Sequence, residues 1–395
     1  MDILEPQQGK LNNGLTFLAL GFRPFFLLAG LSALLLMGAW LAVLLGRLAA
    51  PAYYGPVVWH GHEMLFGYSA AVIAGFLLTA TKNWTGIQTL RYWPLGGLAL
   101  LWLLGRVLPW MVPGGWWLAL LDGLFLPLLA LALAFPLFRS RQRHNIPFVF
   151  LLLLMAVANA LVHLELLGLW DGGVAQGNTL GMGMILTLLV VMGGRVIPFF
   201  IERGLPGATV RKWAWIERLS LPVLLAYVAV QLLWPTSLWA AAITLFAALV
   251  HGWRLLGWHQ GGIWRVPLLW VLWLGYGFVA LGLGVQALGS VGLVSPILSL
   301  HLLSVGGIGV LTLGMMARVA LGHSGRAMQS QPLINLAFAM MVLAAIVRGL
   351  MPLLWPELYL WWLKLSGLLW MSAALAFLWV YLPILCRPRA DGQPG

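Results

Sequence analysis

The sequence predicts an all-α, polytopic membrane protein, and three observations carry this prediction. Of the 395 residues, 62% are hydrophobic and only 8% are charged, and the mean hydropathy is +0.95. A soluble domain carries about 25% charged residues, so a water-soluble globule is excluded. With about 20 apolar residues per crossing and short loops, the length accommodates roughly a dozen transmembrane helices.

Apolar runs separated by Pro, Gly, Arg and Lys predict each helix in turn. Twelve spans are expected, near residues 25–46, 57–80, 93–110, 116–138, 147–170, 179–200, 216–234, 237–258, 267–289, 297–321, 332–354 and 361–384. No segment between them is long enough for a soluble domain, so residues 1–395 are expected to form a single helical transmembrane domain. The polar N-terminal segment contains no short apolar run of the kind that a cleavable signal peptide needs, so the first helix is expected to remain as a span.

Basic residues predict the orientation, because cytoplasmic loops of membrane proteins are rich in Lys and Arg. The N-terminus, every second loop and the C-terminus hold 17 of these residues and the opposite loops only four, namely Arg47, Arg106, Arg348 and Lys364. Both termini are therefore expected in the cytoplasm, and tryptophans in the opposite turns are typical of an outer interface. The net charge of +12 is explained by these loops, so we expect a lipid bilayer as partner and no nucleic acid.

Polar residues gather in one layer of the predicted bundle, although an ionisable side chain costs roughly 2.5–3.5 kcal/mol in the middle of a span. Span 57–80 begins beside His60, His62 and Glu63, which fall about 5–8 Å below the outer surface at 1.5 Å per residue. Four other members of the layer lie at the outer ends of three further spans: Asp122, His163, Glu165 and His301. The only cysteine, Cys386, lies beyond the last span, so disulfides, iron–sulfur clusters and thiolate zinc sites are excluded by count.

Histidines from separate helices are the usual way in which a helical bundle builds a metal or haem site. On a helix His60 and His62 point about 200° apart, so both cannot ligate one iron. His60 heads a stripe of small residues that leaves room for a flat ring, whereas His62 heads a bulkier stripe. Two different roles are expected, with iron on one face and a second metal on the other. Arg106 and Arg348 lie beside the layer, where either could pair with an acid or bind a haem propionate.

Several motifs resemble the NnrS family of bacterial inner-membrane proteins over nearly the full length of the chain. The matching segments are Gly21–Phe26, Trp59–Tyr68, Gly75–Ala80, Asn83–Gly86, Met192–Phe200 and Ala317–Arg326. The resemblance implies haem, expected to be b-type, and copper, together with a role in the nitric-oxide response, in protection from nitrosative stress or in denitrification. Because the last motif contains His323, that residue becomes a candidate metal ligand, although its position at a cytoplasmic helix end also suits an interfacial side chain.

The predicted architecture also looks like the catalytic subunit of haem–copper oxidases. Similar residues recur at a spacing of 123 between Met192–Val196 and Met315–Val319, which suggests three four-helix units. The likeness implies one haem iron held between spans 57–80 and 297–321. We expect His301 as one ligand and either His60 or His62 as the other, and the stripe of small residues favours His60. His62 and His163 then remain for copper or for hydrogen bonds to the acids. Span 179–200 lacks histidine and span 216–234 lacks a histidine pair, which argues against oxygen reduction at a binuclear centre.

The sequence therefore favours a haem- and copper-binding protein of the bacterial inner membrane, with its metals in the periplasmic half and nitric oxide or a nitrosyl species as ligand. Whether it is a haem-dependent oxidoreductase acting on nitric oxide stays open at this point. A membrane transporter of metal or metal–nitrosyl species is the alternative, since twelve helices with repeats suit that class. An assembly partner of a respiratory complex is the third hypothesis.

Overall fold

A computed structural model describes residues 13–393, and every regular element within this range is helical. Lys10 and the rest of the N-terminal segment predicted to be cytoplasmic lie outside the described residues. The elements in chain order are η1 (Asn13–Leu18), α1 (Phe22–Leu44), α2 (Pro56–His62), η2 (Glu63–Ser69), α3 (Ala70–Thr85), α4 (Tyr92–Val107), η3 (Leu108–Trp110), α5 (Trp116–Gly123), α6 (Phe125–Arg139), α7 (Pro147–Leu166), α8 (Gly173–Gly204), α9 (Ala214–Leu233), α10 (Leu238–Trp258), η4 (Gly261–Arg265), α11 (Pro267–Ser290), α12 (Pro296–His301), η5 (Leu302–Val310), α13 (Leu311–His323), α14 (Pro332–Gly349), α15 (Met351–Leu354), η6 (Pro356–Leu358) and α16 (Tyr359–Cys386).

Eleven helices among the described residues are long and apolar enough to cross a membrane. Several of them join consecutive elements: α2, η2 and α3 form one span, α12, η5 and α13 form another, and α5 with α6 a third. Leu, Val and Phe side chains on the outer faces of the bundle are exposed, as expected of a protein surrounded by lipid. The prediction of a polytopic all-α membrane protein is confirmed.

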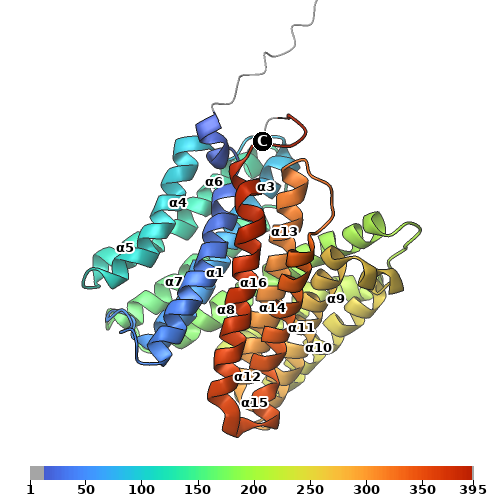
Figure 1. The fold of residues 1–395 in the computed structure, drawn as a ribbon. Helices are drawn as coiled ribbons and strands as arrows, with labels where there is room; N and C mark the ends of the chain where they lie inside the picture. The colour runs from blue at the N-terminus through green and yellow to red at the C-terminus, as the bar shows by residue number, and fades with distance from the viewer. Residues whose placement is uncertain (1–12, 394–395) are drawn as a thin grey trace, which may run out of the picture.

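The predicted span 93–110, the shortest of the twelve, corresponds to α4, which has 16 residues. With the 3₁₀ turn η3 it extends to Trp110, and at 1.5 Å per residue the combined segment covers about 28 Å, close to the thickness of the hydrocarbon core. Both described chain ends lie at the same end of the bundle (Figure 1), where Arg23 donates to the carbonyl of Leu385 over 2.9 Å. Chain ends on the same side of a membrane require an even number of crossings. Beside the eleven long helices, α4 therefore provides the twelfth crossing.

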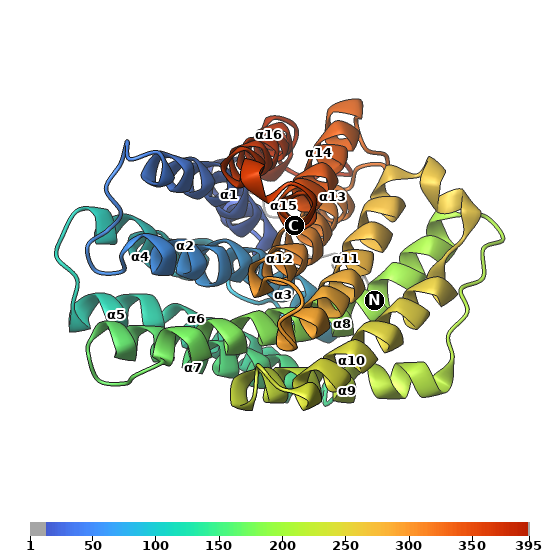
Figure 2. The same ribbon diagram turned by 90° about the horizontal axis from the view of Figure 1, so that it is seen from below.

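Three spans form the centre of the bundle. Within the most apolar 18-residue window, 89% of span Pro56–Thr85, 67% of Gly173–Gly204 and 78% of Pro296–His323 is buried, against 28% of Phe22–Leu44. The first and last spans close the bundle, because α16 packs between α1 and α14 (Figure 2). The central spans that begin at Pro56 and Pro296 carry the histidines His60, His62 and His301 of the predicted polar layer.

Both of these central spans contain a π-helical segment, η2 and η5, directly after their histidine-bearing first turns. Segments of this kind are rare and occur frequently at functional sites. In η2 the Ser69 hydroxyl donates to the carbonyl of Met64, five residues earlier, over 2.7 Å. Two side chains of α4 support the same segment: Trp102 donates to the Gly67 carbonyl over 3.1 Å and Arg106 to the Phe66 carbonyl over 3.2 Å. These bonds satisfy backbone groups where the helical geometry changes.

Candidate metal centre

A buried polar cluster connects the ends of α2, α5 and α7. It consists of His62, Asp122 and His163, each offering one ligand atom, and these atoms lie within 4.8 Å of one another. The Nε2 atoms of both histidines lie 3.1 Å from Oδ2 of Asp122. We name these three residues the His62 cluster. Two imidazoles and a carboxylate are a donor set that copper or zinc accepts, so the cluster could hold a metal ion.

Asn159 holds the cluster together from α7, one turn before His163. Its amide nitrogen donates to Asp122 Oδ2 over 2.8 Å, and its amide oxygen lies 2.9 Å from Nε2 of His62. This residue was not identified from the sequence. The spacing of four residues between Asn159 and His163 places both side chains on one helical face, which is the signal that could have found it.

Arg106 balances the acids of the site. It forms a buried ion pair with Asp122, and its Nε lies 2.8 Å from Oε2 of Glu63. The sequence left two roles open for Arg106, pairing with an acid or binding a haem propionate. In the structure it pairs with acids. Two carboxylates against one guanidinium leave one negative charge. Both ring nitrogens of His62 face acceptors, Nδ1 on Glu63 at 3.4 Å and Nε2 on Asp122 at 3.1 Å, so a proton on His62, or a cation that replaces it, balances this charge.

Two glycines bring the charged groups close together. A Cβ atom on Gly67 would lie 2.7 Å from Oε2 of Glu63, and one on Gly105 would lie 2.7 Å from Oδ1 of Asp122. Any larger residue would push the acids away from Arg106. The local sequence thus favours close packing of charge at two positions on different helices.

Tyrosines from the loop between α1 and α2 cover the His62 cluster. The hydroxyl of Tyr53 lies 3.0 Å from Nδ1 of His163. Burial, and then the charge of Asp122, raise the pKa of Tyr53 to about 12, so the phenol stays protonated and donates this hydrogen bond. Nε2 of His163 then carries the ring proton and donates it to Asp122. The ring of Tyr54 lies 4.8 Å from that of His62.

His60 faces the opposite side of α2, toward α1 and α12. Its ring stacks on Trp40 with 4.3 Å between centroids and 5° between planes. His60 and His301 interact electrostatically with each other and with Arg348, so the three side chains form a second group, which we name the His60 group. The helical geometry that predicted opposite faces for His60 and His62 is confirmed in this arrangement.

Unpaired polar atoms distinguish the His60 group from the His62 cluster. Within the described residues, Nδ1 of His60 and Nη1 of Arg348 are buried without a hydrogen-bond partner. The other guanidinium nitrogen of Arg348 donates to the Tyr359 hydroxyl over 2.9 Å. His301 donates from Nδ1 to the carbonyl of Ile297 over 2.7 Å, which leaves its Nε2 free to act as a ligand.

Two residues of the sequence analysis lie apart from both groups. Glu165 accepts a hydrogen bond from the backbone nitrogen of Val174 over 2.7 Å and so caps the start of α8. His323 ends α13 at the other end of its span, where its Nε2 lies 3.3 Å from the amide of Asn83. A metal on His323 would belong to a separate site, and this role stays a prediction.

One known protein family matches the chain. The profile of the family described as NnrS protein matches residues 16–389, which include the His62 cluster and the His60 group. No curated protein matches the chain.

Proposed function

The chain belongs to the NnrS family, and we propose that it binds haem and copper in the inner membrane of a bacterium and acts on nitric oxide or its iron–nitrosyl products. One observation carries the proposal: His60 and His62, two residues apart, face two chemically different groups. One group has unpaired polar atoms and a single cation, and the other has two histidines on a shared carboxylate. Two cofactors of different chemistry suit such a pair.

The residues of the His60 group fit a haem. His60 and His301 come from separate helices and would hold the iron between them, and Arg348 would bind a propionate through its unpaired Nη1. Haem would supply an iron that can bind a diatomic gas, and with two histidine ligands the gas would have to take the place of one of them. Trp40 orients the His60 ring by stacking, and the Ile297 carbonyl fixes the tautomer of His301.

The residues of the His62 cluster fit copper, for which imidazole is a good ligand. His62 and His163 would hold the ion, while Asp122 and Asn159 orient the ring of His62. In the tautomer of His163 that ligates through Nε2, the proton would sit on Nδ1 and be donated to the Tyr53 hydroxyl, 3.0 Å away. A bound cation would replace the proton on Nε2 of His62, which lies between Asp122 and Asn159, so metal uptake should release a proton.

The membrane interior beyond the two groups argues against the transporter alternative. A cavity between the central spans is lined almost entirely by apolar side chains, with the hydroxyls of Ser69 and Thr312 as its exceptions. A path for a charged metal complex needs polar groups along its length. We therefore favour chemistry at one end of the bundle, with nitric oxide reaching the iron as an uncharged molecule.

Four single substitutions test the two assignments. We expect His60→Ala and His301→Ala to abolish or shift the Soret band of the purified protein, because each removes an axial ligand. His62→Ala and His163→Ala should spare that band and lower the copper content measured by mass spectrometry. His144→Ala, on the exposed loop before α7, is the matched control and should retain both cofactors. An unaltered Soret band with full haem content in His301→Ala would overturn the assignment.

A further inference from the structure

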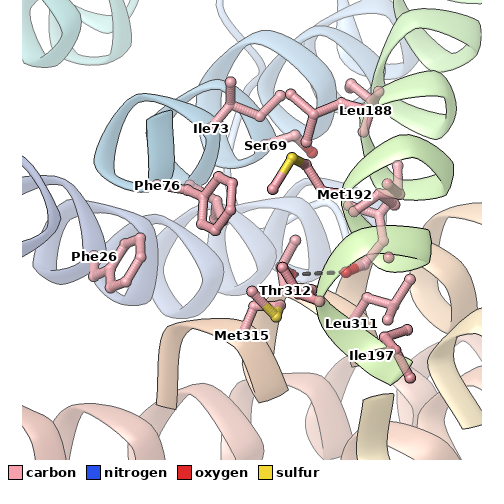
Figure 3. A pocket seen from close by; sticks show the side chains of 16 residues that line it. Phe26, Ser69, Ile73, Phe76, Leu188, Met192, Ile197, Leu311, Thr312 and Met315 are labelled. Carbon is pink, nitrogen blue, oxygen red and sulfur yellow. Dashed lines mark hydrogen bonds between the residues drawn. The ribbon is translucent and has the colours of Figure 1, made fainter. Parts of the chain in front are cut away.

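A cavity lies among the three central spans, between α3, α8 and the segment formed by η5 and α13. Its volume is about 50 Å³, and Ile73, Leu188, Met192 and Met315 are among the side chains that line it (Figure 3). Apolar cavities in proteins stay dry and bind small apolar molecules such as xenon, and a single water needs only about 10–15 Å³. The space is therefore large enough for one small molecule.

No polar atom of the wall is exposed to the cavity, because the two hydroxyls are turned to partners within the protein. Ser69 donates to the Met64 carbonyl over 2.7 Å, and Thr312 donates to the Ile308 carbonyl over 2.7 Å. The Thr312 hydroxyl also accepts a hydrogen bond from the Tyr68 hydroxyl at 2.6 Å. A water needs two to four polar partners in order to occupy a buried site. These internal bonds leave the cavity without such partners and predict that it is dry.

The cavity is linked to both histidine groups by the π-helical segments. Residue Ser69, at the end of η2, lines the cavity, while the start of η2 directly follows His62. Ile308 of η5 also lines it, and η5 directly follows His301. Seven residues at 1.5 Å each separate Ser69 from His62 by about 10 Å. The same apolar space thus lies close to the inner side of each group.

One side of the cavity is less well covered than the rest. Three of the side chains that line it are only half-buried, and they come from three different spans: Phe76, Val196 and Met315. We expect a small molecule to enter on this side, between α3, α8 and α13 and away from the charged His62 cluster.

We propose that this cavity is a binding site for a small, uncharged, apolar gas molecule, which waits there before it reaches the His60 group. The identification of that gas as nitric oxide rests on the proposed function, whereas the existence of the gas site rests on the cavity alone. Its apolar, internally satisfied wall selects against ions and water. A position between both π-helical segments suits a store that supplies the metal groups from inside the membrane.

Xenon is the probe, because it detects the site whether or not a metal is bound. A structure of the purified full-length protein under xenon pressure should show one xenon atom among Ile73, Met192 and Met315. Leu188→Trp should abolish this xenon by filling the space from α8. Leu154→Trp, on the exposed face of α7, should leave it unchanged. Ordered water or a lipid chain in the cavity, or no xenon in the wild-type protein, would overturn the proposal.

A second variant and a kinetic measurement separate this proposal from the proposed function. Ile73→Phe fills the opposite wall with less added volume, so it tests the site even if Leu188→Trp fails to fold, and it should lower the xenon occupancy. In protein that retains haem, the association and dissociation rates of nitric oxide should fall together in this variant, with an unchanged Kd. Loss of haem in His60→Ala with retained xenon would support both proposals. Retained haem in that variant would contradict only the proposed function, and unchanged rates in Ile73→Phe would contradict the route.

Discussion

His60 and His62 lie two residues apart on α2 and contact different helices on opposite faces of it. The ring of His60 stacks on Trp40 of α1, whereas Nε2 of His62 lies 3.1 Å from Asp122 of α5. A single helical turn therefore contributes to two separate groups. Because a residue of α2 belongs to each, a change in the position of this turn would affect both at once, and the π-helical segment that follows holds it in place.

Glu63→Gln should leave the protein inserted in the membrane but weaken metal retention at the His62 cluster by about 10–100-fold, as substitutions of outer partners typically do. The change removes the negative charge beside Arg106 Nε and beside Nδ1 of His62, 3.4 Å away. Copper content after dialysis against a graded chelator measures the effect. Glu202→Gln, at an exposed position near the end of α8, is the control. Equal metal content in all three proteins would show Glu63 to be an ordinary packing residue.

Arg106→Leu should destabilise the protein by about 3–5 kcal/mol, because removal of one partner from a buried ion pair leaves uncompensated charge. Here both Glu63 and Asp122 lose their cation. Arg106→Lys should recover only part of the loss, since an ammonium group lacks the planar fork that spans two acids. Thermal unfolding in detergent measures both variants, with Arg47→Leu on an exposed turn as the control. A midpoint for Arg106→Leu equal to that of the control would contradict the ion-pair assignment.

Tyr53→Phe should change how stability depends on pH at the alkaline end. The pKa of Tyr53 is raised from 10.0 to about 12 in the folded protein, first by burial and then by Asp122. A raised folded pKa contributes stability that is fully present below pH 10 and is lost as the pH rises toward 12. The wild-type protein should therefore lose stability relative to Tyr53→Phe between these values. Chemical unfolding at several pH values checks this, and parallel pH profiles of the two proteins would refute it.

The orientation can be tested with reporters at the two ends of the bundle. The basic loops predict that a cytoplasm-active reporter fused after Arg389 functions, and that one inserted at Gly292 does not. Gly292 joins α11 to α12 at the end that carries His301, and a Cβ there would meet nothing within 4 Å, so an insertion is tolerated. The reverse pattern would place both histidine groups on the cytoplasmic side.

Much of the candidate site follows from helical geometry alone. The separation of His60 from His62 needs only the angle between residues on a helix, and the gathering of His163, His301 and Asp122 at one end needs only span lengths. The partner of Glu165 could not be predicted, because its bond to the Val174 backbone depends on how the following turn places the start of α8. Tyr53 was missed for a similar reason, since loop conformation brings it over His163.

The sequence by itself determined the membrane class, the number of crossings and the end of the bundle at which the histidines gather, because hydropathy and loop charge act on each segment independently. Tertiary structure alone decided which histidine meets which acid, and where the apolar cavity lies. Asp122 is 41 residues from His163, and Asn159 is 97 residues from His62, so these contacts depend on the rotation and tilt of separate helices. The π-helical segments η2 and η5 change that rotation within the two central spans, and their backbone geometry is fixed by packing against neighbours rather than by the periodicity of apolar residues.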